Sequence, residues 1–393
     1  MTALGALGIL IGFFAWRFAF VNRTRARVAI FGALYVFHLL CTIAFYLYAQ
    51  NNVSDSMGYY LDPGNFAAQG FGLTTQLIYW LVQGLKGMFG GTYLDFCLLF
   101  QNFGFFAVVL LMRAFEEVYE GLGVEQPLWT YFLLFLPGLH FWTCTVGKDG
   151  IVMMGVCMAL WGALDMRKRF LWIAIGLALV LVIRPHIAIV SGAAVAATLL
   201  FDRSISWGLR ALLMFAAIGA VAVAVVTLRS TYQIDVTSAD SVSDYFAAHE
   251  AATQGTSEAG NTAVYGNFFV KLFSLLFRPF FLDAGGAMGY GSSLENLILM
   301  LVIAVPLFRF RMTIAAAARV PFVRFAFFHA ILVATMLAMV YYNVGLGLRQ
   351  KVMFVPALLL LAVTVAAVRN ARAQLAITEA AARLPMRGRT ARA

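Results

Sequence analysis

Charged residues are scarce in this chain. Asp, Glu, Lys and Arg make up 12% of its 393 residues, while hydrophobic residues make up 62%. Soluble domains carry about a quarter charged residues, so this chain cannot cover its surface with water-facing groups. The composition therefore excludes an ordinary soluble globular protein.

Cysteine is also rare, and the residues that occur lie in apolar runs: Cys41, Cys97, Cys144 and Cys157. They fit small buried hydrophobic side chains better than disulfides or a metal site. The chain has no metal-ligand spacing, no Gly-rich nucleotide loop with its lysine, and no Gly-x-Ser-x-Gly motif. We therefore expect no metal and no cofactor.

Other absences narrow the class further. Alternating short strands, which a membrane barrel requires, are not visible. The first apolar run lacks a basic segment before it and is followed by Asn22-Arg23, so a cleavable signal is not expected. The net charge of +10 does not indicate nucleic acid, because the basic residues are spread over short loops and the tail. We see no internal repeat and no second soluble domain.

What the chain does contain is a series of long apolar runs. Such runs predict transmembrane helices, because in lipid the backbone amides must be bonded within the segment. We expect an all-α, polytopic transmembrane helical bundle that forms a single integral membrane domain over residues 1–393, with about eleven spans. The expected spans are 2–21, 28–49, 92–112, 127–146, 151–164, 170–183, 187–201, 209–228, 294–308, 325–342 and 352–368.

Basic residues between the runs predict the orientation. Arginines and lysines concentrate in 22–27, 167–169, 309–324 and the tail 369–393, which are therefore expected to be cytoplasmic, with the N-terminus outside. Residues 71–89 are expected to form an interfacial helix. Residues 229–292 are expected to form one long external loop that includes an amphipathic helix.

On this topology, ionisable residues gather at the external face. Most lie at a helix end beside Gly or Pro, and such groups are costly at the membrane edge unless they are paired or hydrated. We expect them to line a water-filled, electropositive cleft in which arginines bind phosphate and a carboxylate accepts a proton. The residues are Asp55, Lys148, Asp149, Arg184, His186, Arg278, Arg349 and Lys351.

Simpler interpretations stay open for most of these residues. Arg349 and Lys351 flank a span and are also explained by contact with lipid headgroups, as is Arg278 in its aromatic helix. Asp55, and the pair Lys148 and Asp149, are also explained as helix caps. His186 is also explained as a neutral histidine at the boundary. Arg184, followed by Pro-His, favours a functional role. The residues expected to make only interior contacts are Arg17, His38, Asp95 and His140.

Three segments resemble those of known membrane enzymes. Residues 55–60 carry an Asp followed by Tyr59 and Tyr60, similar to the first external loop of polytopic glycosyltransferases of the GT-C type. Residues 137–149 resemble the Pro, Phe-Trp and Lys-Asp segment of bacterial proteins in that group. Residues 343–356 resemble the end segment of O-antigen and exopolysaccharide polymerase-like proteins.

The resemblance implies a bacterial inner-membrane enzyme that transfers sugar from a polyprenyl phosphate or diphosphate donor to a glycan acceptor on the extracytoplasmic face. It implies Asp55 as the general base; we add Asp149 as the alternative base. It implies that Arg184, Arg278 and Arg349 hold the lipid phosphate; we add Tyr59, Lys148, His186 and Lys351 as substrate-binding residues. Membrane lipids and a polysaccharide export machinery are the further expected partners. The alternative function is a transporter or flippase of lipid-linked sugars, which predicts a central site and inverted repeats.

Overall fold

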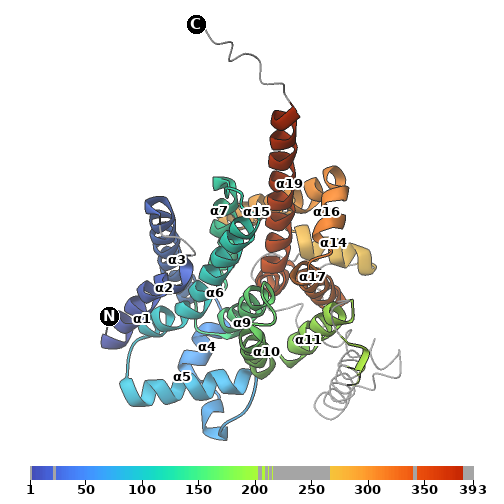
Figure 1. The fold of residues 1–393 in the computed structure, drawn as a ribbon. Helices are drawn as coiled ribbons and strands as arrows, with labels where there is room; N and C mark the ends of the chain where they lie inside the picture. The colour runs from blue at the N-terminus through green and yellow to red at the C-terminus, as the bar shows by residue number, and fades with distance from the viewer. Residues whose placement is uncertain are drawn as a thin grey trace, which may run out of the picture.

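The structure is a computed structural model, and it describes residues 2–20, 24–201, 206–208, 211, 215, 266–339 and 343–383. Every element assigned within these residues is an α-helix or a short 3-10 helix, so the predicted all-α class is confirmed for this part of the chain (Figure 1). The predicted span 209–228 and the loop 229–265 lie almost wholly outside the described residues.

The N-terminal half begins with two short helices and the first long one, and it ends at a chain of short helices. Its elements are α1 (Ala3–Phe14), α2 (Trp16–Ala19), α3 (Arg25–Asn51), α4 (Asp55–Leu61), η1 (Phe66–Gln69), α5 (Thr75–Phe89), α6 (Tyr93–Gly121), α7 (Leu128–Phe132), η2 (Leu133–Phe135) and α8 (Pro137–Phe141).

The C-terminal half alternates medium and long helices. Its described elements are α9 (Lys148–Ala163), α10 (Phe170–Ile183), α11 (Pro185–Leu200), α14 (Phe268–Phe277), α15 (Gly286–Arg309), α16 (Arg311–Ala317), α17 (Pro321–Met339), α18 (Val344–Gln350), η3 (Lys351–Met353) and α19 (Val355–Arg383).

Five of the described helices are long and apolar enough to cross a membrane, judged by length and composition: α3, α6, α15, α17 and residues Val355–Thr378 of α19. The predicted count of eleven spans is not supported. The predicted spans 170–183 and 187–201, for example, correspond to helices of 14 and 16 residues. A straight crossing needs about 20 residues, so these helices are too short for one.

The predicted span 127–146 is wrong as a continuous helix. It is divided into α7, η2 and α8, followed by turns up to Gly147. Pro137 is the first residue of α8, and Leu136 before it has an extended ψ of 121°. A residue before proline is pushed out of the helical conformation, so the helix is interrupted at this point.

The predicted span 92–112 is shorter than the helix that contains it, because α6 continues to Gly121. Glu117 in this extension accepts hydrogen bonds from Arg113 and Arg169, both at 2.6 Å. The 29 residues of α6 correspond to a length of about 44 Å at 1.5 Å per residue. The helix is therefore longer than a bilayer core of about 30 Å.

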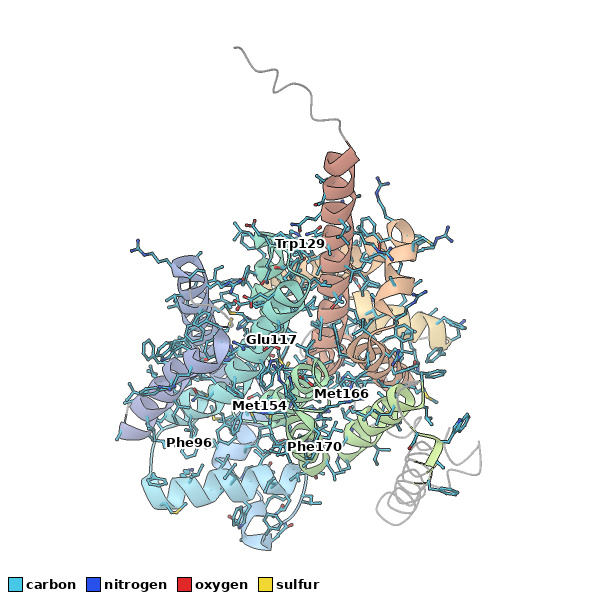
Figure 2. The ribbon with its side chains drawn as sticks, viewed as in Figure 1. Phe96, Glu117, Trp129, Met154, Met166 and Phe170 are labelled. Atoms are coloured by element: carbon cyan, nitrogen blue, oxygen red, sulfur yellow. The ribbon has the colours of Figure 1, made fainter. Side chains whose placement is uncertain are left out.

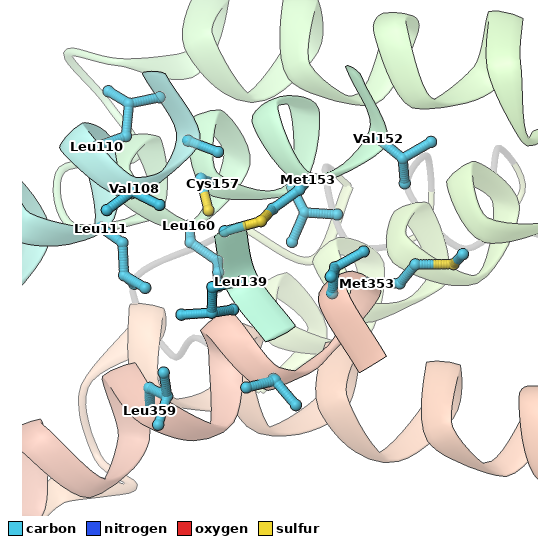
Figure 3. Packing of buried hydrophobic residues seen from close by; sticks show 14 of the residues in the cluster. Val108, Leu110, Leu111, Leu139, Val152, Met153, Cys157, Leu160, Met353 and Leu359 are labelled. Atoms are coloured by element: carbon cyan, nitrogen blue, oxygen red, sulfur yellow. The ribbon is translucent and has the colours of Figure 1, made fainter. Parts of the chain in front are cut away.

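The centre of the bundle is α6, the most buried of the five long helices. It packs against α1, α3, α9 and α19. Figure 3 shows part of the core, with labelled members from α6, α8, α9, η3 and α19: Val108, Leu110, Leu111, Leu139, Val152, Met153, Cys157, Leu160, Met353 and Leu359. The four cysteines are free and buried, as expected.

Glycines set how closely some of these helices approach. A Cβ on Gly155 of α9 would lie 2.5 Å from the carbonyl oxygen of Gly176 in α10, and a Cβ on Gly176 would meet that of Gly155 at 2.4 Å. Gly104 of α6 is packed in the same way against Thr143. Small residues at helix contacts are typical of membrane bundles, which gain their stability from close packing.

The two ends of the bundle differ (Figure 1). At one end, here called the α5 end, α5 lies across the other helices beside α4. At the opposite end, here called the α19 end, α19 projects beyond the bundle and α7 lies beside it. Figure 2 places Trp129 toward the α19 end and Phe96 and Phe170 toward the α5 end.

Candidate functional site

Two arginines and two aspartates form one continuous chain of ion pairs at the α5 end. Arg349 donates from Nη1 to Asp55 Oδ2 at 2.6 Å. The Nε of the same guanidinium donates to Asp149 Oδ2. Arg184 donates from Nη2 to Asp149 Oδ1 at 2.7 Å. The order is Asp55, Arg349, Asp149, Arg184, so four residues distant in sequence share one network.

Helix ends bring these residues together. Asp55 is the first residue of α4, whose preceding Ser54 caps the helix, and Asp149 is the second residue of α9. Arg184 lies between α10 and α11, where Pro185 begins a new helix, and Arg349 lies in the last turn of α18. Carboxylates near helix N-termini and cations near C-termini are favoured by the helix dipole. The local sequence therefore supports each placement.

Asp149 is the buried centre of the network, with a side chain that is only 4% exposed. Burial alone would raise the pKa of this carboxyl group, but Arg349 and Arg184 outweigh that effect and hold the pKa below its ordinary value. An ionised carboxylate can be buried when its charge is paired and its oxygens are bonded. Asp149 is therefore a fixed anion that holds the two arginines in place.

Asp55 has a different environment. Its side chain is 59% exposed, and Arg349 is its ion-pair partner. The sequence analysis predicted Asp55 and Asp149 as alternative bases, and the structure shows that the two carboxylates differ in exposure. Only the exposed one can be reached by a substrate without breaking the network.

A cavity of about 130 Å³ lies against the network. Its wall combines three aromatic side chains, from Phe45, Tyr48 and Trp142, with the residues Ser54, Ser56 and Thr145. The lining also includes Asp55, Asp149 and Arg349. An aromatic wall with a few convergent polar groups is typical of small-molecule sites.

Hydroxyl groups continue from this cavity into the bundle. Tyr93 donates from its hydroxyl to Ser56 Oγ at 2.7 Å, and Ser56 in turn contacts Thr145 Oγ1. Both Ser56 and Thr145 line the cavity. The hydroxyl chain fixes the wall of the cavity between α4, α6 and the segment before α9.

The other predicted residues near this network have distinct roles. Lys148 donates to Thr75 Oγ1 at 2.9 Å, which ties α9 to the start of α5, and burial together with Arg184 lowers the pKa of Lys148. His186 is exposed. Tyr59 is buried against Tyr79, so it belongs to the supporting wall. Burial and Asp55 raise the pKa of Tyr59, which keeps the phenol neutral.

Arg278 and Lys351 belong to a second, adjoining cluster. Arg278 pairs with Asp283. Lys351 is buried; it donates to Asn296 Oδ1 and lies 3.4 Å from the carbonyl oxygen of Arg278. Glu295 accepts from the backbone N–H of Gly138 at 2.7 Å. Lys351 therefore faces the interior between α15 and α18, away from any headgroup.

The expected surplus of free arginines is not present. Arg184, Arg278 and Arg349 each pair with a carboxylate. The two arginines and two aspartates of the first network balance one another, and Lys148 beside it adds one positive charge. The site is less electropositive than the sequence predicted, because the sequence did not show that the aspartates pair with the arginines.

Sequence reasoning missed the aromatic wall and the pair Glu295-Asn296. The signal for the pair was available, because a Glu-Asn dipeptide at the start of an apolar run is costly unless it has a partner. Phe45, Tyr48 and Trp142 gave no such signal, since aromatic residues are abundant throughout the chain. His38 and His140, expected to make interior contacts, lie 2.9 Å apart through their Nδ1 atoms.

Among the residues that the structure describes, no three His, Cys, Asp or Glu side chains are grouped so that they could hold a metal ion. Comparisons of the chain with protein-family models, with curated proteins and with solved structures found no match.

Proposed function

We propose that this protein is a membrane glycosyltransferase or polysaccharide polymerase that transfers sugar from a polyprenyl phosphate or diphosphate donor. The observation that carries the proposal is the exposed carboxylate of Asp55, held by Arg349 at the rim of the aromatic cavity. A carboxylate so placed can accept the proton of an acceptor hydroxyl group. The sugar ring would pack against the aromatic wall, which offers flat apolar faces.

The two aspartates take different roles in this mechanism. Asp55 is the general base, because it is exposed and reachable. Asp149 is a positioning residue, because it is buried between two guanidinium groups with a lowered pKa. Asp55 takes the proton of the acceptor hydroxyl group, which makes the acceptor oxygen nucleophilic. This oxygen attacks the anomeric carbon of the donor sugar as the bond from that carbon to the phosphate oxygen breaks.

The leaving phosphate needs a cation, and the network together with Lys148 carries one net positive charge. Lys148, with an ammonium group bonded to a single hydroxyl group, is the cation least committed to a carboxylate. His186 lies exposed close by, two residues from Arg184. The lipid tail would lie among the apolar helices. The charges gather at the α5 end of the bundle, which favours an enzyme at one membrane face over a transporter with a central site.

The test is to purify the protein in lipid nanodiscs and follow consumption of a polyprenyl-diphosphate-linked sugar in the presence of a glycan acceptor. We expect Asp55→Asn to lower the rate by about 10²- to 10⁴-fold, the usual contribution of a general base. Asp165→Asn is the matched control, because Asp165 pairs with Lys168 in the turn after α9 and lies outside the network. It should leave the rate unchanged.

Two results would contradict the proposal. Full activity of Asp55→Asn would show that Asp55 is not the general base. Movement of the lipid-linked sugar between leaflets of a proteoliposome without its consumption would instead support the transporter. Arg349 is a poor first target, because its loss leaves Asp149 buried with one partner fewer, and breaking a buried ion pair costs about 3–5 kcal/mol of stability.

A further inference from the structure

Six arginines surround α16, toward the α19 end of the bundle, and none of them forms an ion pair with a residue that the structure describes. They are Arg309, Arg311, Arg319, Arg324, Arg369 and Arg372. The sequence explains this, because no Asp or Glu occurs between Asn296 and Thr378. Arg369 lies over the ring of Phe310 at 4.7 Å, and Arg372 donates to the carbonyl oxygen of Met312 at 3.4 Å.

Other arginines toward the same end do form ion pairs. Arg27 pairs with Glu120 at 2.9 Å, and Arg113 and Arg169 both pair with Glu117 at 2.6 Å. These glutamates all belong to α6, the central helix of the bundle. The positive charge around α16 is therefore a local surplus and not a general property of this end.

An apolar cavity of about 390 Å³ is lined by residues of α15, α16, α17 and α19, Arg324 among them. Its lining contains aliphatic and aromatic side chains, among them Pro306, Ile314, Phe327 and Leu361, and a single charged residue, Arg324. A cavity of this composition suits a hydrocarbon chain, and Arg324 marks the one place where it can accept a charged group.

The guanidinium of Arg324 is held in place by hydrogen bonds from Nη1, but its Nε donor is not satisfied by the described residues. Its Nη1 donates to the carbonyl oxygen of Arg319 at 2.8 Å and lies 3.5 Å from that of Ala318. Its Nε is buried and has no hydrogen-bond partner among the described residues. A buried donor without a partner costs about 1–3 kcal/mol. A ligand oxygen at this position would remove that cost.

We propose that this cavity is a binding site for an anionic phospholipid. One acyl chain fills the apolar cavity, and the phosphate accepts a hydrogen bond from Nε of Arg324. The remaining arginines around α16 supply the surrounding positive field. Arginine binds phosphate through two adjacent N–H groups, and basic pockets between membrane helices are suited to anionic headgroups. Because this lipid lies toward the opposite end of the bundle from Asp55, the site is independent of the proposed glycosyl transfer.

Charge complementarity selects the anionic class. A zwitterionic headgroup brings its own cation to the phosphate and gains little from six arginines that form no ion pair within the described part of the chain. A phospholipid with a net negative charge neutralises part of the surplus. Free phosphate offers the same oxygens but leaves the apolar cavity unfilled, so it should bind far more weakly.

The test measures the thermal midpoint of the full chain in detergent with added phosphatidylglycerol, phosphatidylcholine or inorganic phosphate. A ligand that binds only the folded protein raises the midpoint with concentration. We expect a concentration-dependent rise with phosphatidylglycerol, at least tenfold weaker apparent binding of phosphatidylcholine, and no rise with phosphate alone.

Two variants test the two halves of the site. Arg324→Gln removes the phosphate donor, and Ala318→Trp places a large side chain at an exposed position on the cavity wall. Each should weaken phosphatidylglycerol binding at least tenfold. Arg25→Gln is the control, because Arg25 is an arginine at the start of α3 and does not line the cavity. It should bind phosphatidylglycerol like the unmodified protein.

Each contrary outcome overturns the proposal. Equal binding of phosphatidylglycerol and phosphatidylcholine would show that the site does not select for charge. An equal loss of binding in Arg25→Gln would show that the attraction is general electrostatics and not a local site. Unchanged phosphatidylglycerol binding in Arg324→Gln would show that Arg324 does not contact the lipid phosphate. Native mass spectrometry of lipid retained by each variant gives a second readout that does not depend on a change in intrinsic stability.

Discussion

At the scale of single residues, Arg349 decides the geometry of the candidate site. Its Nη1 and Nε atoms serve Asp55 and Asp149 at once, which a lysine ammonium on a flexible stem would not do with the same directionality. Arg349 is 23% exposed while Asp149 is 4% exposed, so the guanidinium connects a buried anion to an accessible one. One side chain thereby positions the base of the proposed reaction.

Lys351 gives a prediction about pH. Burial lowers the pKa of Lys351 to about 7, although Glu295 acts in the opposite direction, while the ordinary value is 10.5. Between these values the unfolded chain binds more protons than the folded one, so stability rises with pH in this window and is constant below it. We expect the thermal midpoint in detergent to rise from pH 7 to pH 9.5, and this rise to be smaller in Lys351→Met.

The comparison needs a lysine in a different environment. Lys271 of α14 is only half-buried and serves as the control. The midpoint of Lys271→Met should follow the same pH course as the unmodified protein. If Lys351→Met also follows that course, then Lys351 does not carry the pH dependence.

At the scale of the elements, local sequence was sufficient for most helices but not for their lengths or their continuity. The apolar runs that predicted 28–49 and 92–112 correspond to α3 and α6, both of which extend further. The extension of α6 contains Glu117, which accepts a hydrogen bond from Arg169, 52 positions further along the chain. The interfacial helix predicted at 71–89 corresponds to α5, and the amphipathic helix predicted within 229–292 corresponds to α14.

Close contact between α9 and α10 gives a prediction at this scale. A Cβ at position 155 would lie 2.5 Å from the carbonyl oxygen of Gly176, so Gly155→Ala forces the helices apart. Overpacking of this kind costs about 1–3 kcal/mol. We expect a lower thermal midpoint in detergent, measured by the loss of the monodisperse peak on size-exclusion chromatography after heating.

Gly32 in α3 provides the contrast for that measurement. Nothing lies within 4 Å of its Cβ position, so Gly32→Ala meets no obstacle and removes a residue with poor helix propensity. Its midpoint should be unchanged or higher. An equal loss in both variants would show that the cost comes from glycine itself and not from the helix contact.

At the scale of the whole molecule, the two ends of the bundle carry different chemistry. The α5 end holds the chain from Asp55 to Arg184, while the arginines around α16 and α19 lie toward the other end. The distribution of basic residues predicts that the α5 end is extracytoplasmic and the α19 end cytoplasmic.

Cysteine labelling tests this orientation. The four native cysteines are buried and free, so they give little background. Val53 before α4 is 92% exposed, and Ile377 late in α19 is 70% exposed. Helix α4 lies at the α5 end of the bundle, and α19 projects from the opposite end (Figure 1). A membrane-impermeant maleimide should label Val53→Cys in intact cells and should label Ile377→Cys only after the membrane is opened. The reverse pattern would invert the topology and place Asp55 in the cytoplasm.

The sequence by itself determined that the chain is helical and apolar and that ionisable residues stand at helix boundaries, because composition and local hydrophobic runs govern both. It did not determine which charges would pair. Arg349 reaches Asp149 across 200 positions in the chain, and Phe45 and Trp142 meet at one cavity, only when the helices are packed. Packing brings opposite charges together wherever burial would otherwise leave them unpaired. The tertiary structure therefore decided that the predicted arginines hold carboxylates, and that Asp55 is the carboxylate left within reach.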